Sequence, residues 1–143
     1  METSIPAGRP KPLADADTAP FWAAAQERRL SVQFCENCDR AIFPPKPACP
    51  HCLGELAWRD LNGRGSVYSF CISRMNFIGG YKAPYIVAWV ASDEHPECIF
   101  NCNIVDCAIE DVRIGMPVEV VFETRPEGVT VPQFRPIREG APA

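Results

Sequence analysis

Residues 35–52 read CENCDRAIFPPKPACPHC, a stretch that holds two Cys-x-x-Cys pairs separated by ten residues. In each pair the second thiolate follows the first after one tight turn, so that all four sulfurs can point at a single ion. Prolines at positions 44, 45, 47 and 50 stiffen the stretch and keep the entropy of closing it small. The spacing predicts a tetrahedral zinc site whose ligands are Cys35, Cys38, Cys49 and Cys52.

The ligand count decides what such an ion can do. Four thiolates fill the coordination sphere of zinc and leave no position for water or substrate, so we expect one structural Zn²⁺ per chain. Rubredoxin-like iron is a rival, because Cys49-Pro50-x-Cys52-x-Gly54 matches part of a rubredoxin knuckle. Against iron, Asp39 stands where that family has glycine, and the two pairs are too close together. A disulfide framework is the remaining interpretation of these cysteines.

The first residues of the chain indicate in which cellular compartment the protein is expected. Residues 1–19 are rich in Pro, Ala and Asp and contain no apolar segment, so they do not resemble a signal peptide. Metal-holding thiolates suit a reducing compartment, and we expect a cytoplasmic protein. No apolar run approaches the ~20 residues that span a bilayer, so a membrane partner is not expected.

Composition and charge describe an ordinary globular chain with one modest core. The 143 residues are 47% hydrophobic and 22% charged, with a net charge of −4. Binding to nucleic acid is driven by clustered Lys and Arg that release counterions. Around the cysteines, Glu36 and Asp39 offset Arg40 and Lys46, so the pattern predicts no basic face. We expect no nucleic-acid partner, and a nucleic-acid-binding ribbon and barrel adaptor is kept as the alternative function.

The N-terminal part divides into an arm and a helix. Residues 1–17, with three prolines among small polar residues, predict a flexible arm. Residues 18–30 predict a short helix that ends near Arg29, because Asp17 or Thr18 can cap it and Pro20 is tolerated in its first turn. Near its start stand Phe21 and Trp22, which either pack against the domain or anchor the helix to a partner.

The rest of the chain is predicted to be β. The expected ribbon covers residues 31–61. Alternating apolar residues predict one strand over 30–34, which leads into Cys35, and another around Leu56 to Leu61. After the turn Asn62-Gly63, residues 62–143 form the second expected domain. Its five strands are predicted at 65–73, 83–92 (apolar at Tyr85, Val87 and Trp89), 97–105, 118–122 and 129–137, with a short turn or helical piece at 109–115. This order fits an OB-fold barrel, although another small barrel or a sandwich stays open.

The loop Asn76–Lys82, NFIGGYK, joins the first two barrel strands. Its two glycines permit positive φ angles and close backbone approach, and in OB barrels this loop borders the ligand face. Phe77 and Ile78 are large apolar residues, which are unusual in a loop. We expect them at a partner interface, together with Phe21 and Trp22, or else folded back over the barrel end.

Outside the ribbon, the sequence offers little chemistry. Cys98 and Cys102 lie ~13 Å apart along one predicted strand, so one zinc ion cannot bridge them. With Cys71 and Cys107, they are expected to be small buried hydrophobes. The sequence has no nucleophile elbow, Walker loop, dinucleotide fingerprint or His-Glu-x-x-His motif. We therefore expect no catalysis by this chain alone.

The order of these features resembles the DUF35 family, in which a rubredoxin-like zinc ribbon precedes an OB-fold. The resemblance covers about residues 18–137. The matching segments are Pro20-Phe21-Trp22, Arg28-Arg29-Leu30, Gln33-Phe34-Cys35-x-x-Cys38, Phe43-Pro44-Pro45, Cys49-Pro50-x-Cys52, Trp58, Gly63 to Phe70 and Ile114 to Val120. Members of this family are non-catalytic partners of thiolase-fold proteins that act on acyl-CoA.

The resemblance implies a mainly β protein with an N-terminal helix, a rubredoxin-like zinc ribbon and a C-terminal five-stranded OB-fold barrel. It also implies an accessory subunit of a thiolase, aldolase or acyltransferase, assembled around a thiolase dimer. Such a subunit would stabilise the complex or shape its CoA and acyl channel, in a degradative pathway such as aromatic or sterol side-chain breakdown. CoA contacts do not transfer from the family, and charge and position alone nominate Arg74, Tyr81 and Lys82.

Overall fold

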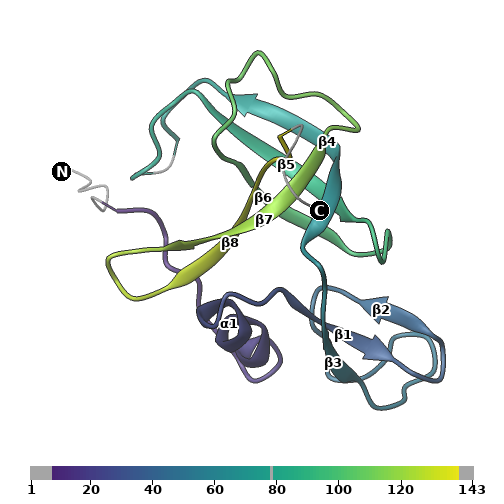
Figure 1. Cartoon of the computed structure of the whole chain (residues 1–143). Helices are drawn as coiled ribbons and strands as arrows, with labels where there is room; N and C mark the ends of the chain where they lie inside the picture. The colour runs from purple at the N-terminus through teal and green to yellow at the C-terminus, as the bar shows by residue number, and fades with distance from the viewer. Residues whose placement is uncertain (1–7, 78, 139–143) are drawn as a thin grey trace.

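The computed structural model describes residues 8–77 and 79–138. Within these ranges the chain forms one short helix, a three-stranded sheet and a closed five-stranded barrel (Figure 1). The strand order of the barrel is β4-β5-β6-β8-β7, with antiparallel pairs throughout except for β6 and β8. This is the mainly β architecture that the sequence predicts, with a helix and a ribbon ahead of a closed barrel.

The helix α1 covers Ala19–Gln26 and is shorter than predicted. Just before it, the Thr18 amide donates to Asp15 Oδ1 (2.9 Å) and the Asp15 amide donates to Thr18 Oγ1 (3.0 Å). The helix stops before Arg29 because Arg28 takes the left-handed conformation, with φ of 60°, and the Arg29 amide turns back to the Ala24 carbonyl. This backbone reversal lies beyond what helix propensity can predict.

The ribbon is an antiparallel sheet with β1 (Ser31–Cys35) at its centre. It lies between β2 (Arg40–Ile42) and β3 (Ala57–Asp60). All five residues of β1 are buried, which agrees with its central position. Strand β2 was not predicted, because three residues between a turn and a proline run are too few to show an alternating pattern.

The five barrel strands lie close to their predicted positions. They are β4 (Arg64–Ser73), β5 (Tyr85–Ser92), β6 (Ile99–Ile104), β7 (Pro117–Thr124) and β8 (Thr130–Pro136). Between β6 and β7 the chain makes turns over residues 109–111 and 114–115 and no helix. One of these turns is closed by the Asp111 amide, which donates to the Ala108 carbonyl at 3.0 Å.

The two faces of β5 differ from what the sequence pattern indicates. Ile86, Ala88 and Val90 are buried inside the barrel, whereas Trp89 on the other face is 51% exposed. Tyr85 and Val87 share the face of Trp89 and are partly buried. Both faces carry apolar residues, so alternation alone does not say which one faces the core.

A continuous core joins the helix, the ribbon and the barrel. A chain of aromatic contacts runs from Phe21 in α1 to Phe43 after β2 (5.7 Å between ring centres). It continues from Phe43 to Phe100 in β6 (4.6 Å) and on to Phe134 in β8 (6.0 Å). The three parts therefore share one hydrophobic cluster. The predicted boundaries at residues 17/18, 30/31 and 61/62 remain predictions.

Candidate metal centre and barrel-end cavity

The two cysteine pairs stand at tight turns at one end of the ribbon. Cys35 is the last residue of β1, and Asp39, one residue beyond Cys38, has a φ of 52°. In the second pair the Leu53 amide donates to the Cys49 carbonyl at 2.8 Å, and Leu53 has a φ of 62°. Each of these left-handed residues follows the second cysteine of its pair and turns the chain back after it.

The four sulfurs are already arranged as one ligand set. The Sγ atoms of Cys35, Cys38, Cys49 and Cys52 all lie within 4.8 Å of one another. Cys35 Sγ lies 3.6 Å from Cys52 Sγ, and Cys49 Sγ lies 4.0 Å from Cys38 Sγ. Zn–S bonds of about 2.3 Å in a tetrahedron separate two sulfurs by ~3.8 Å. The residues present therefore fit a four-coordinate metal ion, as predicted.

Backbone amides contact three of the four sulfurs. The amides of Cys38, His51 and Gly54 point at the sulfurs of Cys35, Cys49 and Cys52 at 3.3–3.4 Å. At Cys49, burial opposes ionisation, but amide donors from Cys52 and His51 outweigh it and lower the pKa to about 7. Such N–H···S contacts orient and tune metal-bound cysteines.

The environment of the ligand set agrees with a structural role. Cys35 and Cys49 are fully buried, whereas Cys52 is exposed. His51 lies between two ligands in sequence, but its Nε2 is 3.1 Å from Arg40 Nη1 at the surface. The set of four thiolates is complete without it.

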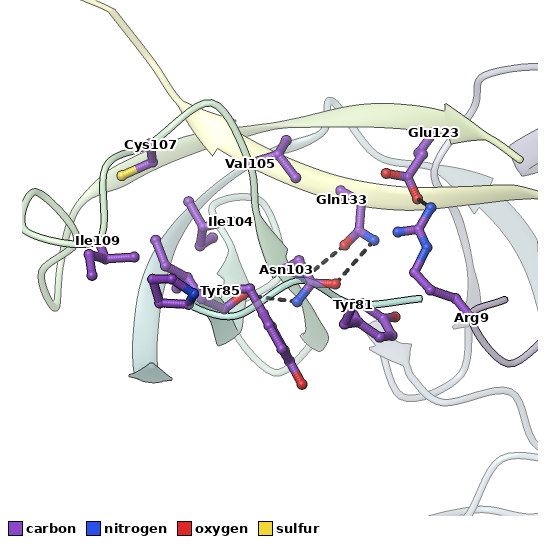
Figure 2. Close-up of a pocket in the computed structure, with 12 residues that line it drawn as sticks. Arg9, Tyr81, Tyr85, Asn103, Ile104, Val105, Cys107, Ile109, Glu123 and Gln133 are labelled. Carbon is purple, nitrogen blue, oxygen red and sulfur yellow. Dashed lines mark hydrogen bonds and ion pairs between the residues drawn. The ribbon is translucent and has the colours of Figure 1, made fainter. Parts of the chain in front are cut away.

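A separate cavity of about 230 Å³ opens at one end of the barrel (Figure 2). Tyr81 and Tyr85 form an aromatic wall, with ring centres 5.0 Å apart and ring planes inclined by 29°. The cavity is lined by Arg9, Tyr81, Pro84, Tyr85, Ile86, Asn103, Ile104, Val105, Cys107, Ile109, Glu123 and Gln133. Of these residues, Tyr81 was predicted from the sequence as a site residue.

Polar groups in this cavity are paired with one another. The backbone amide of Asn103 donates to Gln133 Oε1 (2.7 Å), and its side-chain Nδ2 donates to the Ile86 carbonyl (2.9 Å). At the side of the cavity Arg9 Nη2 lies 2.6 Å from Glu123 Oε1, so the two charges offset each other. The cavity therefore suits an uncharged group with apolar and amide character.

The predicted interface residues have different surroundings. Phe21 is buried in the core, edge to face with Trp22 at 5.1 Å, so it packs the protein and is not offered to a partner. Trp22 is partly buried. Phe77 is 73% exposed, as a contact residue needs to be, and Ile78 lies outside the described residues. The sequence did not distinguish these roles, because apolar residues at the start of a helix can pack either against the core or against a partner.

Of the three predicted CoA residues, one lines the cavity. Tyr81 lines the barrel-end cavity, whereas Arg74 and Lys82 are exposed. Two other exposed aromatic residues, Tyr68 and Trp89, were not predicted as site residues, and they are 57% and 51% exposed. A register shift between Val67 and Ser69 in β4 accounts for Tyr68. Bulges of this kind redirect a side chain, and the sequence carries no signal for this one.

The remaining cysteines differ in burial. Cys98 and Cys102 are buried, as predicted, and burial raises the pKa of each thiol to about 12, with the Glu97 carboxylate adding to the effect at Cys98. Cys71 is exposed on β4, so the prediction of a buried residue is wrong there. It shares the outer barrel face with Val87, its partner in β5. Cys107 is partly buried.

Two family models match this chain. Residues 22–59 match the model described as ChsH2, rubredoxin-like zinc ribbon domain. Residues 58–123 match the one described as ChsH2, C-terminal OB-fold domain. Within the described residues, no helix has the length and apolar character needed to cross a membrane.

Two relatives and one solved structure are similar over most of the chain. A probable enoyl-CoA hydratase alpha subunit of Thermomonospora curvata is 37% identical over 90% of this chain, which spans only 40% of that relative. A DUF35 domain-containing scaffold protein of Methanocaldococcus jannaschii is 33% identical, covering 77% of this chain and 79% of the relative. A solved structure described as an Ltp2-ChsH2(DUF35) aldolase has a TM-score of 0.80 and 35% identity, covering 88% of this chain and 98% of the other.

Proposed function

This chain belongs to the DUF35 family of zinc-ribbon and OB-fold proteins, and on that premise we propose that it is an accessory subunit of a thiolase-fold acyl-CoA enzyme. The observation that carries the proposal is the likeness to the ChsH2(DUF35) chain of an aldolase that also contains Ltp2, over 98% of that chain. In this role the catalytic groups belong to the partner, and this chain supplies a rigid surface.

Zinc gives the ribbon its stability. A closed Cys₄ zinc site supplies on the order of 10 kcal/mol or more of folding free energy, which allows a very small sheet to stay rigid. The ribbon is also joined to the barrel, because the Ala41 amide donates to Glu97 Oε1 at 3.2 Å. Zinc is thus proposed to set the position of the ribbon and to take no part in the chemistry.

The outer face of β4 and β5 is the proposed contact with the partner. Tyr68 and Trp89 expose aromatic rings there, and an open hollow at Trp89 is also lined by Ser69, Cys71 and Val87. Exposed aromatic residues that cluster on one face mark binding surfaces. Phe77, in the loop that follows β4, is a further candidate.

Contact with the CoA ester is proposed at the loop before β5. Arg74 and Lys82 are exposed cations suited to phosphate groups. The cavity beside Tyr81 suits the uncharged part of the molecule. A degradative pathway, such as aromatic or sterol side-chain breakdown, would supply the ester.

The similarity to a hydratase alpha subunit favours a second candidate for the partner. That relative is 37% identical over 131 residues, yet it is much longer than this chain. A hydratase polypeptide is therefore the second partner class that we propose, in place of a thiolase-fold protein. Identification of the co-purifying protein separates the two candidates.

The test is affinity purification of the tagged full chain from its native lysate at moderate salt, followed by mass spectrometry. We expect a thiolase-fold protein in stoichiometric amount. Tyr68→Ser combined with Trp89→Ser should reduce its recovery at least tenfold. Ile114→Ser is the control, because Ile114 is 70% exposed in a loop outside the proposed face.

Other outcomes would contradict the proposal. Recovery of the chain alone, or with nucleic acid, would exclude the accessory role and favour the adaptor alternative. That alternative also predicts salt-dependent oligonucleotide binding, so a flat titration at low salt would exclude it in turn.

A further inference from the structure

The start of the described chain lies against the barrel end and forms one side of the cavity in Figure 2. Arg9 makes two contacts there. Its guanidinium pairs with Glu123 of β7 at 2.6 Å, and its central carbon lies 5.4 Å from the centre of the Tyr81 ring. The side chains of Arg9 and Glu123 are 24% and 33% exposed. A partly desolvated pair of this kind is screened less by solvent than a surface pair.

A second arginine holds the next residue of the arm. Arg125 is buried, and its Nη1 donates to the Pro10 carbonyl at 2.7 Å. Its Nε lies 3.7 Å from Glu123 Oε1 and makes no hydrogen bond with the described chain. Glu123 therefore lies between two guanidinium groups, and the arm completes the surroundings of both. An isolated buried charge is costly, so these partners favour the docked arm.

The backbone of the arm also packs closely on the loop before β5. Gly80 has a φ of 84°, and a Cβ at this position would lie 2.4 Å from the Arg9 backbone nitrogen and 2.8 Å from the Gly8 carbonyl carbon. Only glycine permits this approach. The next residue is Tyr81, whose ring lies between Arg9 and Tyr85.

We propose that residues 8–10 are a latch that holds Tyr81 in place as a wall of the barrel-end cavity, with Arg9 as its positioning residue. The latch links the arm, the loop before β5 and the hairpin of β7 and β8. Its functional value rests on the proposed function, in which this cavity receives part of a CoA ester. The latch itself needs no partner and no ligand, so it is tested on the isolated chain.

The experiment measures backbone ¹⁵N order parameters by NMR in the full, zinc-loaded chain. We expect values near 0.85 at Arg9, Gly80 and Tyr81, as in rigid backbone. Arg9→Met keeps most of the side-chain length and removes the charge. It should lower all three values below about 0.6. Arg9→Lys, which keeps the charge, should retain most of the order.

Two further variants make the result specific. Lys11→Ala removes an exposed cation from the same arm and should change none of the three values. Gly80→Ala acts from the loop side and should free Arg9, because coupling between two segments is reciprocal. This variant therefore tests the contact without any substitution in residues 8–10.

Three results would overturn the latch. Order parameters below 0.6 at Arg9 in the unmodified chain would mean that the arm is not docked in solution. A loss of order at Arg9 alone in Arg9→Met would mean that the arm does not hold Tyr81. Equal effects of Arg9→Met and Arg9→Lys would exclude the ion pair as the cause. None of these results depends on the identity of the partner enzyme.

Discussion

At the scale of single residues, the eight cysteines have four different environments. Four form the ligand set, Cys98 and Cys102 are buried thiols, Cys107 is partly buried, and Cys71 is exposed on the outer face of β4. Reactivity of a thiol depends on its thiolate fraction and its exposure. The same residue type therefore serves as metal ligand, core residue and surface group in one small chain.

This contrast predicts the order of alkylation. In the zinc-loaded protein at pH 8.5, iodoacetamide should label Cys71 first. Cys98 and Cys102 should stay unlabelled, because burial raises the pKa of each to about 12 and keeps the thiol protonated. Peptide mass mapping over time checks this order. Labelling of Cys102 as fast as Cys71 would contradict the buried position.

A glycine in β4 gives a second prediction. A Cβ at Gly65 would lie 2.4 Å from the Ala91 carbonyl oxygen and 2.9 Å from a Val90 methyl carbon. Gly65→Ala should therefore lower the free energy of unfolding by about 1–3 kcal/mol, the usual cost of overpacking. Denaturant unfolding measures it. Gly8→Ala has open space around its Cβ, and an equal loss there would exclude the steric explanation.

At the scale of elements, the ribbon depends on its metal more than the barrel does. The strands β1, β2 and β3 of its sheet are short, with 5, 3 and 4 residues. A small hydrophobic cluster, separate from the main core, lies in the ribbon. It consists of Cys35, Ile42 and Cys49, with Cys38 and Leu56 packed against them. Without zinc, these buried thiols lose the ion that holds them together.

Removal of zinc should accordingly melt the ribbon first. We expect a strong chelator to abolish amide-exchange protection in β1 and β3, while protection in β5 and β6 is only partly reduced. Hydrogen exchange with mass spectrometry reads out both regions. Cys38→Ser should give the same pattern without a chelator. Unchanged protection in β1 after complete removal of zinc would contradict a structural metal.

Much of the element level could be predicted from the sequence. The ligand set follows from local spacing, and the barrel strands from alternation between turn residues. The face of β5 that carries Trp89 could not be predicted, because Ile86, Ala88 and Val90 form an equally apolar face. Arg9 was missed for another reason. Its partner Glu123 is more than a hundred residues away, and only the closed barrel brings them together.

At the scale of the whole molecule, the helix, ribbon and barrel act as one body. Helix α1 lies beside the hairpin of β7 and β8 (Figure 1), where the Gln26 side chain donates to the Gly128 carbonyl at 2.7 Å and accepts from Thr130 Oγ1 at 3.1 Å. The Phe43 ring connects ribbon and barrel. A rigid body of this kind can present the outer face of β4 and β5 to a partner with little loss of conformational entropy.

The accessory role is tested most directly by removing this chain from its complex and adding it back. The purified complex would be assayed for turnover of its CoA ester before removal, after removal and after re-addition of the zinc-loaded chain. We predict that removal lowers activity at least tenfold and that re-addition restores it, whereas the Tyr68→Ser, Trp89→Ser chain does not. Full activity and stability of the partner without this chain would contradict the account.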